Sequence, residues 1–283
     1  MAFKTSSLKI LVLVISIYFP STVFCSQHQT EWRSINKQFF ALQQNPNIGK
    51  LEYEQIEELG IKSIDYAKKN FGLNSIQYAT SLNNLALVYR KVRFYNKAEP
   101  LYKEALVIAK KNYDKNQLFF AATSSNLAVL YIDQKKYASA LPLLKSALSI
   151  IETALGKDNS QRANTLNSLA ETYNEINDFN KAEKMYLQSL ELFQKLLGKD
   201  HYNIAVVMDN IAALYYKHKK YSESEKYYKA SLAIKKKLFG KNHTRTYMNL
   251  INLAKIYKAT DQNSLAQEMQ KRSEHIKKRT NNQ

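Results

Sequence analysis

The sequence is poor in the residues that end regular structure, with 6 glycines and 4 prolines in 283 residues. Strands joined by tight turns need such residues often, so their scarcity favours a mostly helical chain. A single cysteine, Cys25, excludes a disulfide scaffold and a cysteine-rich metal site. Acidic residues are also scarce: 24 Asp and Glu stand against 42 Lys and Arg, for a formal net charge of +18. With 45% hydrophobic residues and a mean hydropathy of −0.45, the chain is neither a multi-span membrane protein nor wholly disordered.

The first 25 residues have the pattern of an export signal. Lys4 and Lys9 stand before and beside an apolar run, Ile10–Phe19, which is too short to span a bilayer as a helix. We therefore expect residues 1–25 to be a secretory signal peptide, which would make the protein secreted or periplasmic. An uncleaved membrane anchor is the alternative.

Cys25 leaves two outcomes open. Val23 and Cys25 are small residues at the −3 and −1 positions, so we expect cleavage after Cys25. Alternatively, Cys25 is retained and lipidated, although Phe24 departs from the small residue that a lipoprotein signal usually has there. We expect contact with a membrane only if Cys25 is lipidated, and no nucleic acid partner, because an exported protein meets little of it.

Beyond this segment, one motif returns every 42 residues. Its first copy is Asn84-Leu85-Ala86-x-x-Tyr89, and the five copies begin at Asn84, Asn126, Ser168, Asn210 and Asn252. Glycines at 72, 156, 198 and 240 keep the same period, each followed two residues later by Asn or Asp. Glycine suits the left-handed residue that ends a helix, and Asn or Asp suits the start of the next helix. Each such point is therefore predicted to be a junction between two helices.

Between the junctions the apolar spacing is that of helices. Leu82, Leu85, Ala86 and Tyr89 follow i, i+3, i+4, i+7, and a second such set begins at Ala98. We predict an all-α solenoid of antiparallel helix pairs, organised as capping helices in a degenerate repeat over 26–74, five copies over 75–274 with the last one capping, and a fraying basic tail over 275–283.

These residues resemble tetratricopeptide repeats. The stretch "IQYATSLNNLALVYRKVRFYNKAEPLYKEALVI" carries the resemblance, and the sequence L-G-K-D-H ahead of a helix is similar to the 42-residue type found in kinesin light chains. Two departures are Tyr202, where that type commonly has proline, and Ser168, where the other four copies have Asn. The resemblance implies a superhelix whose first helices line a concave groove that holds peptides. It does not carry over the cytoplasmic motor role, which disagrees with a signal peptide.

On a helical wheel, the stripe opposite the core of each first helix is predicted to be unburied within the domain and, by the resemblance, to line the groove. Its Asn column is the sharpest feature, because an amide can pair with the backbone of an extended peptide. The alternative is that these Asn residues are merely solvated. The predicted peptide-groove residues are Asn84, Asn126, Asn210, Asn252, Lys91, Asn164, Glu171, Glu175, Lys217 and Lys255.

The positive charge is predicted to lie elsewhere, on the second helices, at Lys226, Lys229 and Lys235–Lys237. Such runs are usually a solvated face. The second hypothesis for the protein uses this face: an envelope- or surface-anchored structural component that contacts anionic lipid or polymer.

Catalysis is the least favoured function. His201 and His243 lie 42 residues apart at helix junctions, where starting a helix explains them, and they do not form an i, i+4 metal pair. No nucleophile elbow, phosphate-binding loop or zinc-protease motif is present in the sequence. We therefore expect a protein or peptide partner, no enzyme activity, no cofactor and no metal.

Overall fold

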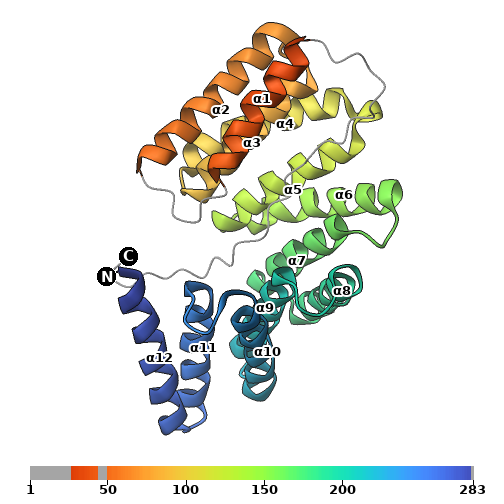
Figure 1. Cartoon of the computed structure of the whole chain (residues 1–283). Coiled ribbons are helices and arrows are strands. Elements are labelled where there is room, and N and C mark those ends of the chain that lie inside the picture. Colours follow the sequence, from red (N-terminus) through yellow and green to blue (C-terminus); the bar gives the residue numbers. More distant parts are fainter. Residues whose placement is uncertain (1–26, 44–49, 282–283) are drawn as a thin grey trace. The chain divides into compact units, whose positions relative to one another are not determined.

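The computed structural model describes residues 27–43 and 50–281 and divides them into two compact units, one up to Ala154 and one from Leu155. Figure 1 shows antiparallel helix hairpins in both. The first unit contains α1 (Gln27–Gln43), α2 (Lys50–Phe71), α3 (Ile76–Lys91), α4 (Tyr95–Lys111), the short η1 (Tyr113–Lys115), α5 (Gln117–Asp133) and α6 (Tyr137–Leu155), the last residue of which opens the second unit. The second unit continues with α7 (Ser160–Glu175), α8 (Phe179–Leu197), α9 (Tyr202–Lys217), α10 (Tyr221–Phe239), α11 (Thr244–Ala259) and α12 (Asn263–Asn281).

The predicted all-α solenoid of helix pairs is confirmed. Each first helix packs on the following second helix, as α3 does on α4 and α9 on α10. The alanine columns lie where these helices touch, since Ala86 and Ala98 have no exposed surface. A methyl group there lets the two backbones approach closely, so the small residues of the repeat set the hairpin spacing.

Each unit has its own hydrophobic core. In the first unit Trp32 of α1 joins Leu82 of α3 and Ile108 of α4 in one cluster. In the second, Leu250 and Tyr257 of α11 pack with residues of α9, α10 and α12. The two N-terminal helices thus belong to the first core, and Trp32 Nε1 also donates a 2.9 Å hydrogen bond to Ser81 Oγ.

The junctions follow the prediction in part. Gly198, for example, ends α8 with a φ of 75°, in the left-handed region where other residues are strained. However, the Asn or Asp two residues later does not cap the next helix. The capping side chain comes one residue further on, as in Asn159, which accepts from the Arg162 backbone N–H at 2.8 Å. Asp158 instead accepts a bond from Lys195 Nζ at 2.5 Å.

The turn inside each hairpin follows from the predicted helix pairs, but its backbone conformation was not predicted. Five residues there have positive φ without being glycine, at a strict interval of 42: Arg93, Lys135, Asn177, Lys219 and Asp261. Asn177 and Asp261 are types that tolerate the left-handed region, but Arg93, Lys135 and Lys219 are not, so the residue types at this position carry no consistent signal. Backbone bonds fix the turn, for example from Phe94 N to Tyr89 O at 2.8 Å.

The predicted fraying tail is wrong over residues 275–281. These residues continue α12, and Ile276 is 2% exposed in the core of the second unit. The apolar side chain at 276 holds this turn of helix on the hairpin, despite the basic residues around it. The signal peptide prediction falls on residues 1–25, outside the described residues.

One described helix, α6, is long and apolar enough to cross a membrane by length and composition alone. This is weak evidence, because core helices of soluble proteins pass the same test. Ala147, Ile150 and Ile151 of α6 pack with Ala121 of α5 in a hydrophobic cluster, although only 22% of the apolar window is buried.

Candidate functional site

The stripe predicted to line the groove is more buried than expected. Leu87 is 3% and Val129 8% exposed, on α3 and α5, and Val206 on α9 is 7% exposed. Within each unit, first helices of consecutive copies contact each other, as α3 does α5 and α7 does α9, so each covers part of its neighbour's stripe. The expectation that nothing within the domain buries this stripe is therefore wrong.

The Asn column shows the same correction in its hydrogen bonds. Asn126 Nδ2 donates to Asn83 Oδ1 at 3.1 Å, and both side chains are buried. Asn210 Nδ2 donates to Asn167 Oδ1 at 3.0 Å in the second unit. Asn84 Nδ2 reaches Asn36 Oδ1 at 3.3 Å. These amides therefore join one copy to the preceding one. Their role in contacting a partner stays a prediction, and burial makes it a minor one for Asn126 and Asn210.

The other predicted groove residues are more accessible. Lys217 and Lys255 are exposed, on α9 and α11, and Lys217 Nζ also donates to the Asn174 carbonyl at 2.6 Å. Asn164 and Asn252 are half-buried. The remaining three predicted groove residues, Lys91, Glu171 and Glu175, each interact with another residue.

A polar pair on α3 and α5 lies beside these residues in the first unit. Arg90 Nη1 contacts Asp133 Oδ2 at 2.9 Å, and both side chains are mostly buried. Burial raises the pKa of the Asp133 carboxyl, while Arg90 opposes that rise. The two residues are 43 positions apart and join consecutive copies, as the Asn pairs do.

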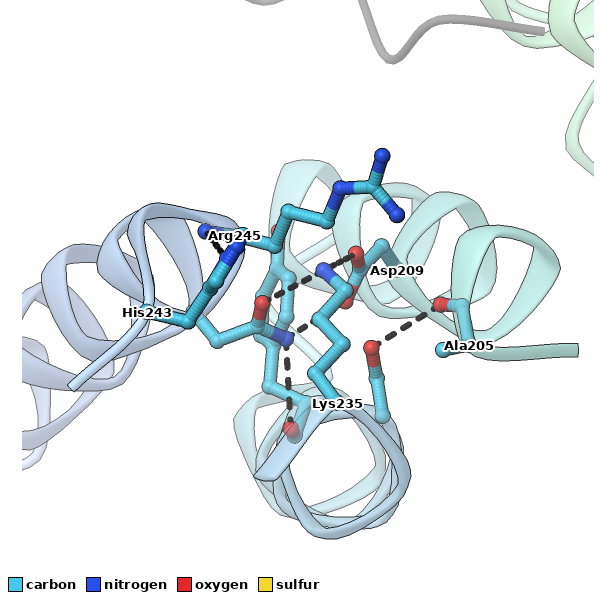
Figure 2. Close-up of polar contacts among 8 residues, drawn as sticks. Ala205, Asp209, Lys235, His243 and Arg245 are labelled. Atoms are coloured by element: carbon cyan, nitrogen blue, oxygen red, sulfur yellow. Dashed lines mark hydrogen bonds and ion pairs between the residues drawn. The ribbon is translucent and has the colours of Figure 1, made fainter. Parts of the chain in front are cut away.

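The second unit holds a fully buried charge cluster, which Figure 2 shows with its neighbours. Lys235 Nζ of α10 contacts Asp209 Oδ2 of α9 and donates to Asn249 Oδ1 of α11 at 2.6 Å. Asn249 Nδ2 closes the triangle by donating to Asp209 Oδ1 at 2.6 Å. The Lys235 and Asp209 side chains are 6% and 4% exposed. Lys235 therefore does not lie on a solvated basic face, which corrects that prediction.

The same view contains the start of α11. His243 Nδ1 accepts from the Arg245 backbone N–H at 3.1 Å, so this histidine caps the helix, as predicted. Burial, and then the Arg245 charge, lowers the pKa of the His243 ring. The Arg245 guanidinium lies 4.6 Å and 4.4 Å from the ring centres of Tyr202 and Phe239, and so packs against both aromatic side chains, which are in edge contact with each other.

The rest of the predicted basic face is partly neutralised. Lys229 Nζ contacts Glu225 Oε1 at 2.6 Å, and Lys237 contacts Asp200. Lys226 Nζ lies 6.0 Å from the centre of the Tyr227 ring. Lysines that are paired with carboxylates attract an external polyanion less strongly than the same number of unpaired lysines would.

The motif tyrosines form a column of hydrogen bonds that sequence analysis missed. Tyr215 donates to Glu183 at 2.8 Å and Tyr257 to Glu225 at 2.9 Å, each 32 residues earlier. Burial is the main cause of the raised pKa of Tyr215, and Glu183 adds to it. The glutamates lie on the 42-residue period at 57, 99, 183 and 225, with Leu141 at the remaining position, a signal that was available in the sequence.

Glu99 shows how strongly such a carboxylate can be held. A hydrogen bond from Lys103 lowers the pKa of Glu99 to about 2 against the opposing effect of burial, and Lys136 and Gln134 assist. Its ionised form is thereby favoured in the folded chain, so its contribution to stability is present above the ordinary carboxyl range and lost as the pH falls towards 2. Among the residues described, no group of three or more His, Cys, Asp or Glu could hold a metal ion.

Comparison with known families adds a sequence match to this geometry. Family models described as tetratricopeptide repeat match residues 79–116, 119–195, 178–237 and 203–279. Together these ranges span more than half of the chain. A comparison with curated proteins found no match.

Solved structures agree in fold. BtubC (BKLC) from P. vanneervenii is 25% identical with a TM-score of 0.69, over 81% of this chain and 92% of that one. A Podosopora anserina protein with nearly identical TPR-like repeats, assigned as a kinesin light chain, is 22% identical with a TM-score of 0.59, over 71% and 95%. NprR, solved with its cognate peptide NprX, is 18% identical with a TM-score of 0.62, over 87% and 66%.

Proposed function

Because the chain belongs to the tetratricopeptide repeat family, we propose that it is an exported scaffold that holds a peptide or protein segment and performs no chemistry itself. The family supplies protein-interaction folds, and the similar NprR was solved with a peptide bound. In this chain the segment would lie against the first helices, over the part of the predicted groove that is exposed.

One observation carries the proposal. On α9 and α11 the stripe keeps two exposed positions 42 residues apart, Ala213 with Lys255 and Lys217 with Ala259, while Asn210 beside them is buried. Each of these helices thus offers one small residue, over which a chain can pass closely, and one lysine, which can bind a carbonyl or carboxylate. Such an arrangement suits an extended segment better than a compact ligand.

A steric test uses two exposed alanines in the second unit. We expect Ala213→Trp to weaken binding of the partner recovered with the natural protein by at least about 10-fold, because an indole on α9 would occupy the space above the stripe. Ala233→Trp on the second helix α10 is the matched control and should bind normally. The measurement is affinity of purified full chains for that partner, with melting curves to show that both variants fold. Normal binding by Ala213→Trp together with loss in Ala233→Trp would contradict the groove and favour the face of the second helices.

The export part of the proposal rests on residues 1–25. We expect the natural protein to begin at Ser26 and to carry no acyl chain, because Val23 and Cys25 fit a cleavage site and Phe24 fits a lipoprotein signal poorly. N-terminal sequencing with intact mass measures this. A lipid on Cys25 would instead support the anchored structural component, and an intact Met1 would contradict export by this signal.

A further inference from the structure

A cavity of about 270 Å³ lies in the second unit between α12 and the loop that precedes α11. Its floor is apolar, because Leu250 and Ile276 line it and are 1% and 2% exposed. Its remaining lining is Lys241, Asn242, Lys271, Arg272 and His275, with no acidic residue among them. The cavity therefore joins an apolar base to a cationic rim.

The charge of this rim is poorly neutralised. The nearest carboxylate contact is that of Glu268, whose Oε1 lies 3.5 Å from Arg272 Nη1, a long contact between two side chains that are both well exposed. The positive charge of Arg272 also affects Lys236 of α10. Burial lowers the pKa of Lys236, Arg272 lowers it further, and Glu268 opposes this. An anion that reached the rim would thus find donors that no partner among the described residues holds tightly.

The same place differs from that in the two preceding copies. In the preceding two copies the loop residue corresponding to Asn242 is an aspartate, and Asp158 and Asp200 each neutralise a lysine of their own hairpin, Lys195 and Lys237. The positions of Arg272 and His275 correspond to two alanines, 230 and 233, in the preceding copy. Asn74 and Asn116 stand at the same loop position in the first two copies, so the asparagine is not peculiar to the last one. The last hairpin differs from the two preceding copies in having no acid in the loop, and it also has two basic side chains at 272 and 275, so packing of the repeat alone does not account for the cavity's charge.

We propose that this cavity binds a small organic anion: a carboxylate attached to an apolar group about the size of a leucine side chain. Arg272 would hold the carboxylate in its planar fork of donors, with Lys241 and Lys271 beside it. The apolar group would cover Leu250 and Ile276, where it would be removed from water. Such a group occurs both as a free acid and as the C-terminal residue of a peptide.

The experiment titrates the full chain with N-acetyl-leucine, with N-acetyl-leucinamide and with inorganic phosphate, following heat or chemical shifts. We expect the acid to bind at least about 10-fold more tightly than the amide, which lacks the charge, and than phosphate, which lacks the apolar group. A tripeptide that ends in leucine separates the sources: tighter binding than N-acetyl-leucine indicates a peptide C-terminus, and equal binding a free acid.

Two variants of opposite sign assign the site. Arg272→Gln should weaken binding of N-acetyl-leucine at least about 10-fold, whereas Glu268→Gln, which releases Arg272 from its carboxylate, should strengthen it. Lys258→Gln, at an exposed lysine of α11 outside the rim, is the matched control and should bind as the natural chain does. Equal binding of acid and amide, an Arg272→Gln variant that binds normally, or no binding by any probe would overturn the proposal.

Discussion

Replacing Asp209 with alanine is expected to lower the free energy of unfolding by about 3–5 kcal/mol, because it leaves Lys235 charged and buried without its carboxylate. Both side chains are almost entirely inaccessible to water, and Asn249 alone cannot neutralise the ammonium group. Chemical denaturation of the purified chain, followed by helical circular dichroism, measures the loss.

Two controls separate the cost of an unpaired charge from the value of the pair. Asp209→Leu combined with Lys235→Met removes both charges. The free energy of unfolding of this double variant should lie within about 2 kcal/mol of that of the natural chain, because apolar side chains often replace a buried ion pair at little cost. Lys237 lies on the same helix as Lys235 and forms an exposed pair with Asp200. Lys237→Met breaks this pair and should lower the free energy of unfolding by at most about 1 kcal/mol. If Asp209→Ala lowers the free energy of unfolding no more than Lys237→Met does, the buried pair does not exist in solution.

Tyr215→Ala is the second substitution with a large expected effect, a loss of about 3–5 kcal/mol. Its ring is buried between helices of the second unit, 6.2 Å from the Phe179 ring centre and 5.7 Å from that of Tyr227, and truncation would leave a cavity. The measurement is again equilibrium unfolding.

The matched variant Tyr215→Phe keeps the ring and removes only the hydroxyl that donates to Glu183. It should cost about 0.5–1.5 kcal/mol, the usual net value of one hydrogen bond. Similar losses in Tyr215→Phe and Tyr215→Ala would mean that the hydrogen bond rather than the ring supplies the stability of this column.

The helices were predictable because each copy repeats the same residue pattern for one pair of packed helices. A period of 42 with Ala86 and Ala98 at the hairpin contact leaves one packing of two helices, and Gly198 marks a helix end by a backbone conformation that other residues adopt at a cost. The strongest signals in the sequence were thus those of local geometry and of close approach.

The groove was harder to predict because a helical wheel describes one helix without its neighbours. It placed Asn126 and Asn210 opposite the core of their own hairpins, which is correct, yet the first helix of the adjacent copy covers them. Lys235 was misplaced for a related reason. Its partner Asp209 is 26 residues away, on another helix, and only the three-dimensional packing brings this lysine of a basic run to a buried carboxylate.

The buried cluster also limits how freely the repeats could be exchanged. It draws one residue from each of three consecutive helices, so a cut at Gly240 would separate Asn249 from Asp209 and Lys235. A transplanted copy that ended there would carry a lysine and an aspartate into an interface where the next helix offers Val207 or Thr165 in place of Asn249. Although the copies share one length and one fold, the fourth and fifth are matched to each other, so we expect that they must be moved together in any recombination of the array.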